Sequence, residues 1–218
     1  MKIVNYTVYK GNPYTRAIYS SILPEYEPVK GDIDDAILEL KTNKIGVIHI
    51  HWEEHLIRHC RSVSEAKQLV AYNLARLEYF KKLGGIVLWT VHNALPHEME
   101  FPDLFLQYRK GIALLANRIL VHNAATITLL SNQGIQFAWK TSVLSHPSYL
   151  RVYTDTKPDI STITPLAVNK SILAFGLVRR YKNLERLFID LDPTFTQQHG
   201  LHITVSEPCY PVTTMPRD

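Results

Sequence analysis

The chain has 218 residues, of which 46% are hydrophobic and 20% charged, and its formal net charge is +4. This balance excludes intrinsically disordered, collagenous and coiled-coil proteins, and so small a charge does not require a nucleic-acid partner. No apolar run reaches the roughly 18 residues of a membrane span, and the sequence starts without the apolar stretch of a secretory signal. We therefore expect a cytoplasmic globular protein whose two cysteines, Cys60 and Cys209, are free thiols.

Short apolar or β-branched runs alternate with amphipathic stretches over the first two thirds of the chain. Strands are predicted at residues 2–9, 27–30, 47–51, 86–91, 119–122 and 141–144. Helices are predicted at residues 13–23, with Asn12 as the N-cap, and at 32–41, 64–83, 102–116 and 124–131. The almost unbroken apolar run at 86–91 is typical of a parallel sheet covered on both faces. The alternation predicts an α/β fold, with a Rossmann-like doubly wound parallel sheet over residues 1–150.

The composition changes at residues 151–170, where Thr, Asp, Pro and Ser are frequent, and we interpret this segment as a linker. A strand at 171–175, a loop at 176–182, a helix at 183–189 and a strand at 201–205 are predicted after it. Residues 171–218 are fewer than half of the roughly 100 that a complete domain needs. We therefore expect the first βαβ unit of a second Rossmann-like domain that is incomplete in this chain.

The segment around His51 suggests a metal site, since His51, Glu54 and His55 match the zinc-binding pattern H-x-x-E-H. That pattern requires both histidines on one helix, four residues apart. His51 instead closes a predicted strand, so a helix can begin only after it. We therefore predict no metal site here and no bound cofactor in the chain.

Polar and aromatic side chains gather at the ends of three predicted strands. They are His51, Trp52 and Glu53 at the first strand, His92, Asn93 and His97 at the second, and His146 at the third. A histidine at a strand end has a structural role more often than a functional one. However, the carboxyl ends of parallel strands meet at one edge of the sheet, where open α/β folds bind ligands. We therefore favour a ligand-binding role for this group.

A glycine and several basic side chains lie between the predicted strand at 171–175 and the next helix. Gly176 allows a ligand to approach the backbone closely, and Arg179 and Lys182 supply positive charge before the helix N-terminus. Such a loop suits a diphosphate, although a solvated basic surface is the simpler alternative. The chain has neither a G-x-x-x-x-G-K-[ST] loop nor a G-x-G-x-x-G fingerprint, which disfavours P-loop NTPases and dinucleotide-dependent enzymes.

Six segments carry these motifs in a fixed order, at residues 12–14, 49–53, 89–98, 119–122, 144–149 and 175–182. Taken together they resemble the bacterial group 1 glycosyltransferases of the GT-B fold, in which two Rossmann-like domains face each other. The resemblance implies transfer of a sugar from a nucleotide-sugar to a lipid-linked or polysaccharide acceptor. The nucleotide-sugar would be a substrate rather than a cofactor, and residues 1–150 would hold the acceptor.

The resemblance also implies roles for individual residues. His92 would contact the donor sugar, and Gly176, Arg179 and Lys182 would hold the donor diphosphate. Glu53 or Glu54 would act as a base if the reaction inverts the configuration, which the family's commoner retaining course does not require. The residues implied to bind substrate are Asn12, Tyr14, His51, Trp52, Asn93, His97 and His146.

Four departures from the family pattern are visible, the first being Arg180 in place of the proline in the segment Arg-Pro-Tyr-Lys-Gly that is common in relatives. Leu177 stands where many relatives have arginine, and Asn183 stands where glycine is common, although asparagine tolerates the left-handed conformation that glycine would supply. The pair of glutamates that binds the donor ribose and sugar has no counterpart in the sequence. A second hypothesis therefore stays open, in which the chain is a noncatalytic remnant or a subunit that binds the acceptor and needs a separately encoded donor domain.

The basic residues also suit an anionic bilayer surface. We therefore expect the protein in the cytoplasm, with peripheral contact at the inner face of the membrane, and we expect no nucleic-acid partner.

Overall fold

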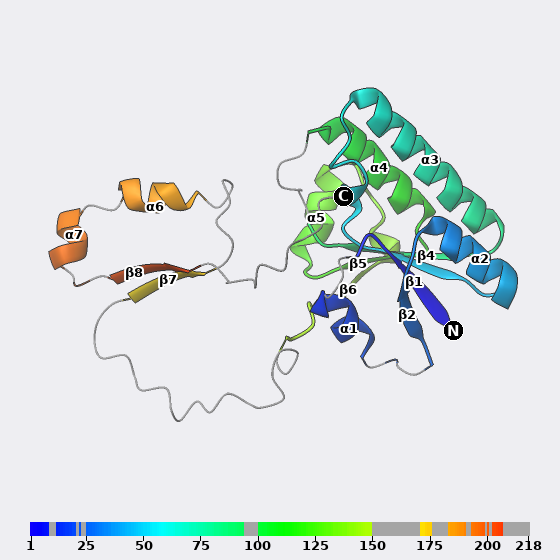
Figure 1. Cartoon of the computed structure of the whole chain (residues 1–218), viewed down its shortest axis with the longest axis horizontal. Helices are drawn as coiled ribbons and strands as arrows, with labels where there is room; N and C mark the ends of the chain where they lie inside the picture. Colours follow the sequence, from blue (N-terminus) through cyan, green and yellow to red (C-terminus); the bar gives the residue numbers. More distant parts are fainter. Residues whose placement is uncertain are drawn as a thin grey trace, which may run out of the picture. The chain divides into compact units, whose positions relative to one another are not determined.

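The computed structural model describes residues 1–8, 12–20, 22, 25–93, 100–149, 171–175, 183–190, 193–198, 200 and 202–206. The chain divides into two compact units, Met1–Lys157 and Pro158–Asp218. The first unit contains most of the described residues (Figure 1).

The first unit is built on a six-stranded sheet with the order β2-β1-β3-β4-β5-β6. Its strands are β1 (Lys2–Tyr6), β2 (Glu27–Lys30), β3 (Val47–Ile50), β4 (Ile86–Val91), β5 (Arg118–Val121) and β6 (Thr141–Val143). Each neighbouring pair is parallel, with Val4 opposite Ile48 and Ile50 opposite Trp89 in the central register. The predicted Rossmann-like α/β fold is thus confirmed.

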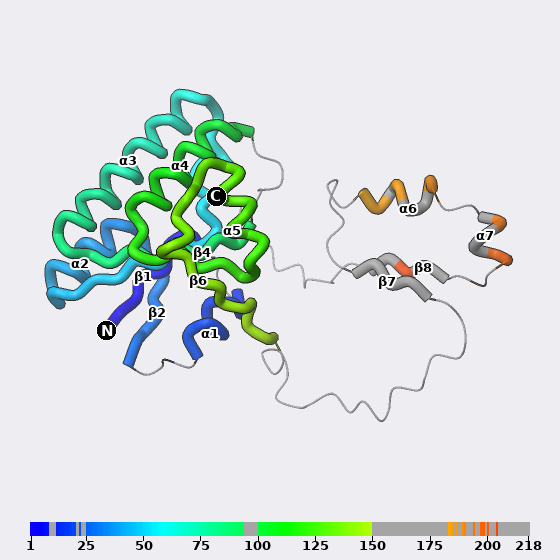
Figure 2. Tube along the Cα trace, turned by 180° about the vertical axis from the view of Figure 1, so that it is seen from behind, coloured from blue at the N-terminus to red at the C-terminus, as the bar shows by residue number. Residues whose placement is uncertain are grey.

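Helices lie on both faces of this sheet, as the doubly wound prediction requires. They are α1 (Pro13–Tyr19), α2 (Ile33–Asn43), α3 (Val63–Lys82), α4 (Pro102–Leu115) and α5 (Ala125–Asn132), with 3-10 turns η1 (Glu53–Leu56) and η2 (Ala138–Lys140). Helices α2, α3 and α4 cover one face and α1 lies on the other, which can be followed along the tube from behind (Figure 2).

Two elements end earlier than the sequence predicts, each for a local reason. Strand β1 stops at Tyr6 because Thr7 has a φ of 60°, a left-handed conformation that is incompatible with a continuing strand. Helix α1 stops at Tyr19 rather than near residue 23, and the Ser20 hydroxyl donates a hydrogen bond to the carbonyl oxygen of Ala17 at 2.9 Å. Side chains of this type compete with the helical hydrogen bonds and favour a helix end.

The core lies between the sheet and the layer formed by α2, α3 and α4. Ile48, Trp89 and Ile119 from the sheet are completely buried, as are Leu77 and Phe80 from α3. At the end of α3 the chain turns sharply into β4, since Gly84 has a φ of 94°. A Cβ atom on the next residue, Gly85, would lie 2.4 Å from the Phe80 ring, so only glycine fits there without movement of that ring.

The second unit is described only in part. Strands β7 (Ser171–Phe175) and β8 (His202–Ser206) pair in parallel, and α6 (Leu184–Asp190) and α7 (Pro193–Gln198) lie between them in sequence. The strand–helix–strand order was predicted, but the short helix α7 was not. Asn183 has a φ of 49°, which is the left-handed conformation expected for it.

None of the helices that the structure describes is long and apolar enough to span a membrane.

Candidate functional site

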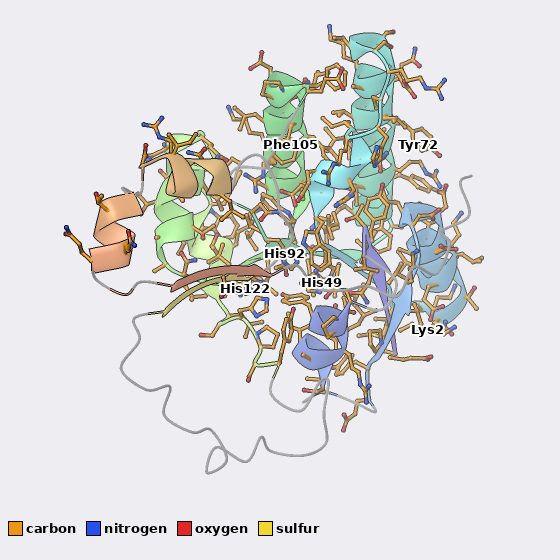
Figure 3. The ribbon with its side chains drawn as sticks, turned by 60° about the vertical axis from the view of Figure 1, so that its left-hand side comes forward. Lys2, His49, Tyr72, His92, Phe105 and His122 are labelled. Atoms are coloured by element: carbon orange, nitrogen blue, oxygen red, sulfur yellow. The ribbon has the colours of Figure 1, made fainter. Side chains whose placement is uncertain are left out.

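Aromatic and imidazole rings from five elements meet at the carboxyl edge of the first sheet. His51 directly follows β3, His92 follows β4 and His122 follows β5, while His146 lies just beyond β6. Because all strands are parallel, their carboxyl ends reach the same edge. His92 and His122 lie near each other there, with His49 close by (Figure 3).

Tyr14, from α1, is the centre of this group. Its ring centroid lies 4.6 Å from that of His92, 5.4 Å from that of His122 and 5.3 Å from that of His146. The rings of His51 and Trp52 both lie 5.8 Å away. We call these six residues the ring cluster. It contains five residues implied by the motifs, together with His122, whose role the sequence did not indicate.

The Asn12 side chain explains how Tyr14 is placed. Asn12 is the N-cap of α1, and its Oδ1 accepts a hydrogen bond from the backbone N–H of Tyr14 at 2.9 Å, with Pro13 in the first helical position. Asn12 was predicted both to cap this helix and to bind substrate. The described contact is the cap.

A hydrogen-bond network lies beneath the ring cluster. His51 Nδ1 is 3.1 Å from His92 Nε2, and His51 Nε2 is 3.0 Å from Asn5 Oδ1. Tyr19 donates its hydroxyl hydrogen to the same Asn5 oxygen at 2.8 Å. The network joins α1, β1, β3 and the end of β4, so it fixes the position of His92 relative to the sheet.

The imidazoles of this network, and that of His49, whose ring centroid lies 4.0 Å from that of His51, are neutral at physiological pH. Burial lowers the pKa of His49 to about 3 and that of His92 to about 3. Burial, with repulsion from the neighbouring imidazoles, also holds the pKa of His51 well below its ordinary value. These histidines therefore act as hydrogen-bonding groups rather than as cations.

A buried ion pair, which the sequence did not reveal, supports the loops after β3 and β4. Arg109 Nε, on α4, donates to Glu53 Oε1 at 2.8 Å, and both side chains are 1% exposed. The other Glu53 oxygen accepts a hydrogen bond from Trp89 Nε1 at 3.1 Å. Arg109 also donates through Nη2 to the backbone oxygen of Asn93. The pair thus connects η1, α4 and the segment that carries His92.

The hydrogen bonds of Glu53 and Glu54 determine whether either carboxylate is available as the general base that the motifs imply. Both oxygens of Glu53 are occupied and the side chain is buried, so its carboxylate does not reach an incoming hydroxyl. Glu54 is buried as well, and its Oε1 accepts a hydrogen bond from Asn93 Nδ2 at 2.7 Å. Both glutamates, and the Asn93 amide that was predicted to bind substrate, take part in holding the two loops together.

Four predicted site residues lie outside the described residues: His97, Gly176, Arg179 and Lys182. The H-x-x-E-H pattern does not form a single helix, because His51 ends the β3 segment and Glu54 and His55 belong to η1. Among the described residues, no group of three or more His, Cys, Asp and Glu side chains is arranged to hold a metal ion.

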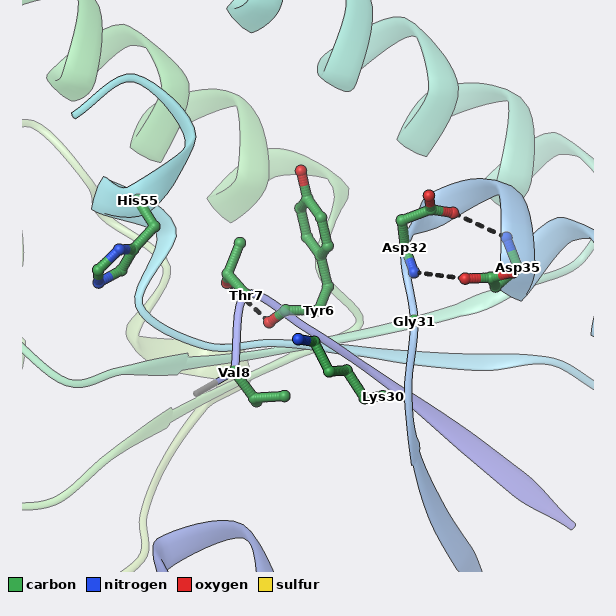
Figure 4. A pocket seen from close by; sticks show the side chains of 8 residues that line it. All are labelled: Tyr6, Thr7, Val8, Lys30, Gly31, Asp32, Asp35 and His55. Atoms are coloured by element: carbon green, nitrogen blue, oxygen red, sulfur yellow. Dashed lines mark hydrogen bonds between the residues drawn. The ribbon is translucent and has the colours of Figure 1, made fainter. Parts of the chain in front are cut away.

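A separate pocket of about 560 Å³ lies at the carboxyl ends of β1 and β2 (Figure 4). Its lining includes Tyr6, Thr7, Lys30 and His55. It also includes Asp32, whose side chain caps α2 by accepting hydrogen bonds from the backbone of Asp34 and Asp35. Part of the acidic lining is therefore occupied in forming the helix end.

No protein-family model matches the chain. A protein of Xanthomonas campestris pv. campestris, GDP-mannose:glycolipid 4-beta-D-mannosyltransferase, is 33% identical over 180 residues. The match covers 81% of this chain and 45% of the relative. The chain is related to a glycolipid mannosyltransferase. A protein of the same name from a second Xanthomonas strain matches to the same extent. The chain thus spans less than half the length of these mannosyltransferases, and the relationship agrees with the glycosyltransferase resemblance of the motifs.

Two solved structures are also similar. HepE of Anabaena in complex with UDP is 12% identical, with a TM-score of 0.49, and the match covers 94% of this chain and 69% of HepE. MnaA of S. aureus in complex with UDP is 14% identical, with a TM-score of 0.43, and the match covers 96% of this chain and 62% of MnaA.

Proposed function

We propose that the chain is part of a glycosyltransferase that moves a sugar from a nucleotide-sugar to a glycolipid acceptor, with residues 1–150 on the acceptor side. The observation that carries the proposal is the 33% identity to a glycolipid mannosyltransferase over 180 residues. GDP-mannose is therefore the first donor to test. The noncatalytic alternative lacks a comparable observation in its favour.

The ring cluster supports this proposal by its place and chemistry. It lies at the carboxyl edge of a parallel sheet, where open α/β folds bind their ligands. The neutral imidazoles of His51 and His92 and the Tyr14 and Trp52 rings offer apolar faces and hydrogen-bonding edges, which suit an uncharged sugar better than a free anion. In this proposal His92 contacts the donor sugar.

The donor diphosphate requires positive charge. Negative charge builds up on the departing nucleoside diphosphate in the transition state, and cations aimed at it stabilise that state. Arg179, Lys182 and the helix after them are the groups proposed for this task, with Gly176 allowing close approach.

The test is a transfer assay with GDP-mannose and a lipid-linked oligosaccharide, in which release of GDP and the glycolipid product are both measured. We expect Lys182→Ala and His92→Ala each to lower turnover by about a hundredfold, the usual scale for one lost electrostatic contact. His59→Gln is the matched control, because His59 is exposed and lies outside the ring cluster. Equal turnover of the Lys182 variant and the unaltered chain would refute the diphosphate assignment.

The noncatalytic alternative predicts a different result in the same assay. A chain that only binds the acceptor would release no GDP from GDP-mannose, and release would appear only after a separate donor domain is added. UDP-glucose serves as the comparison donor, since a donor-specific enzyme discriminates between the two nucleotide-sugars.

We also propose peripheral contact with an anionic bilayer and a role in polysaccharide assembly in the cytoplasm. The net charge of +4 and the glycolipid acceptor in the name of the relative support this contact. Co-sedimentation with vesicles that contain phosphatidylglycerol measures it. Absence of the protein from the vesicle pellet at low salt would contradict it.

A further inference from the structure

In the hydrogen-bond network beneath His92, the donor and the acceptor of each hydrogen bond can be assigned, because the orientation of the Asn5 side-chain amide is fixed. Asn5 Nδ2 donates to the backbone oxygen of Ile3 at 3.0 Å, which turns Asn5 Oδ1 toward His51 and Tyr19. An amide oxygen can only accept hydrogen bonds. The hydrogen between Asn5 Oδ1 and His51, 3.0 Å apart, must therefore belong to His51 Nε2.

The next link passes from His51 to His92. His51 is completely buried and its pKa is held well below the ordinary value, so the ring is neutral and carries one N–H. That N–H is at Nε2, which leaves Nδ1 as an acceptor. The nitrogen facing it at 3.1 Å is His92 Nε2, which must therefore carry the hydrogen of this contact.

These contacts also define the tautomer of His92. Its ring is neutral, because burial lowers its pKa to about 3. With the hydrogen on Nε2, the lone pair lies on Nδ1, and no described protein group forms a hydrogen bond with that atom. A pKa of about 3 makes this nitrogen a poor proton carrier at neutral pH, so its chemistry is to accept a hydrogen bond.

We propose that Asn5, acting through His51, fixes His92 in the Nε2-protonated tautomer, so that Nδ1 is presented as a hydrogen-bond acceptor for a ligand hydroxyl. Asn5 and His51 are positioning residues in this scheme, whereas His92 touches the ligand. That the hydroxyl belongs to a sugar rests on the proposed function; the tautomer itself does not.

His122 supplies a second acceptor beside the first. Its Nδ1 lies 2.8 Å from the backbone oxygen of Leu144, and only a protonated Nδ1 can donate to a carbonyl. In the neutral ring Nε2 is then unprotonated, and among the described side chains this atom is buried without a hydrogen-bond partner. The His92 and His122 ring centroids are 5.5 Å apart.

Two neighbouring acceptors select the chemistry of the ligand. A phosphate or carboxylate oxygen brings lone pairs and would be repelled, whereas a hydroxyl brings the hydrogen that each nitrogen lacks. These two nitrogens are therefore assigned to ligand hydroxyl groups rather than to a diphosphate.

A branch of the same network gives His49 the opposite tautomer. The single hydroxyl hydrogen of Tyr19 is donated to Asn5, so the contact between Tyr19 and His49 Nδ1 needs a hydrogen on that nitrogen. His49 Nε2 then accepts from the Thr90 hydroxyl at 2.7 Å. The network thus specifies the tautomers of His51, His92 and His49, and the separate contact with Leu144 specifies that of His122. The tautomers at His49 and His122 are the form that free histidine populates less.

The test reads the tautomers directly. The full chain is labelled with ¹⁵N-histidine, and long-range ¹H–¹⁵N correlation spectra are recorded at neutral pH, with assignment by single His→Gln variants. We expect N–H at Nε2 of His51 and His92 and at Nδ1 of His49 and His122. A hydrogen on Nδ1 of His92, alone or together with Nε2, would overturn the proposal.

The role of Asn5 is tested with Asn5→Leu, which removes the acceptor but keeps the size. We expect His92 to lose its single tautomer and to show averaged nitrogen shifts. The control is Asn43→Leu, since Asn43 lies exposed at the end of α2, where its side chain donates a hydrogen bond to the Glu39 carboxylate. An unchanged His92 tautomer in folded Asn5→Leu would overturn the role of Asn5. If Asn5→Leu does not fold, the tautomers of His51 and His92 observed in the unaltered chain confirm or refute the proposal.

Ligand addition separates this proposal from the proposed function. We expect GDP-mannose, but not GDP, to shift the resonances of His92 Nδ1 and His122 Nε2. Equal shifts with GDP would overturn the assignment of these two nitrogens to hydroxyls. Absence of mannosyl transfer with the four expected tautomers would count against the enzyme function alone.

Discussion

Trp52 stacks on His92, with the two ring centroids 4.0 Å apart and the ring planes inclined by 14°. Trp52 reaches this position with a φ of 23° and a ψ of 54°, a conformation that costs a non-glycine residue of order 1–3 kcal/mol. The strain is maintained by its surroundings, because the next residue, Glu53, is held by the ion pair with Arg109. Backbone strain, stacking and a buried ion pair therefore converge on the placement of one imidazole.

Removal of the Trp52 ring should expose His92. In Trp52→Ala we expect the pKa of His92 to rise from about 3 toward its ordinary value, because desolvation is the main cause of its depression. Titration of the His92 resonances by NMR measures the change. Trp139→Ala is the control, since Trp139 is 76% exposed and is not part of the ring cluster. A His92 pKa that stays near 3 in Trp52→Ala would show that other groups bury it.

Loss of one partner of the buried ion pair should destabilise the fold strongly. Arg109→Leu leaves the Glu53 carboxylate buried without its cation, which we expect to lower the free energy of unfolding by about 3–5 kcal/mol. The double variant Glu53→Leu/Arg109→Leu should recover most of that loss, because neither charge remains buried. Urea unfolding of the two single variants and the double variant gives the coupling free energy.

A surface ion pair provides the control for this cycle. Arg76 pairs with Asp34, but their side chains are 31% and 53% exposed. Arg76→Leu should therefore change the free energy of unfolding by less than about 1 kcal/mol. A similar loss in Arg76→Leu and Arg109→Leu would mean that burial of the charge is not the cause.

The neutral histidines should make the protein acid-sensitive. Their pKa is lowered in the folded state, so the unfolded state binds more protons as the pH falls. The stabilisation is fully present above about pH 6.5 and is lost as the pH decreases toward 3, at about 1.4 kcal/mol per pH unit for each group. Urea unfolding at a series of pH values measures this slope.

The contribution of one imidazole to this slope can be isolated. In His49→Gln we expect a shallower loss of stability between pH 6.5 and 4.5, because one proton fewer is taken up on unfolding. A slope that does not differ between His49→Gln and the unaltered chain would contradict the prediction.

The turn between α3 and β4 should tolerate no side chain at its second glycine. In Gly85→Ala the new Cβ would meet the Phe80 ring at 2.4 Å, and we expect a loss of about 1–3 kcal/mol of stability from overpacking. Gly85→Ala/Phe80→Leu removes the colliding ring and should lose less than the sum of the two single variants. Thermal unfolding of the four proteins measures the coupling, and simple additivity would argue against the collision.

Much of the fold follows from local patterns. The strand at 86–91 was recognisable because it is apolar throughout, and α1 because Asn12 precedes it as the N-cap. The ends of β1 and α1 could not be predicted from the sequence. They depend on the left-handed conformation of Thr7 and on a hydrogen bond of Ser20, which composition does not encode. The strand-end histidines were found for a topological reason, as parallel strands share one carboxyl edge.

The groups behind the ring cluster were missed because their partners are distant in sequence. In the sequence, Asn5 is an ordinary polar residue of a predicted strand, and no local sequence pattern indicates its contacts with His51 and Tyr19. For Arg109 the sequence does contain one indication, because it lies on the same helical face as Phe105 and Ile112. A charged residue within an apolar helical face indicates that it has a buried partner of opposite charge. Which carboxylate it pairs with depends on how α4 packs, which periodicity alone does not determine.

The parallel order of the six strands also shapes how the chain reaches its native state. No strand can pair with the next through a tight turn, because a helix or a long connection must be traversed first. Sheet assembly is therefore dominated by distant contacts, and folding is expected to be slow. Apolar segments that have not yet paired stay exposed during synthesis, so folding competes with aggregation. The yield of folded protein at elevated temperature should therefore depend on the supply of chaperones.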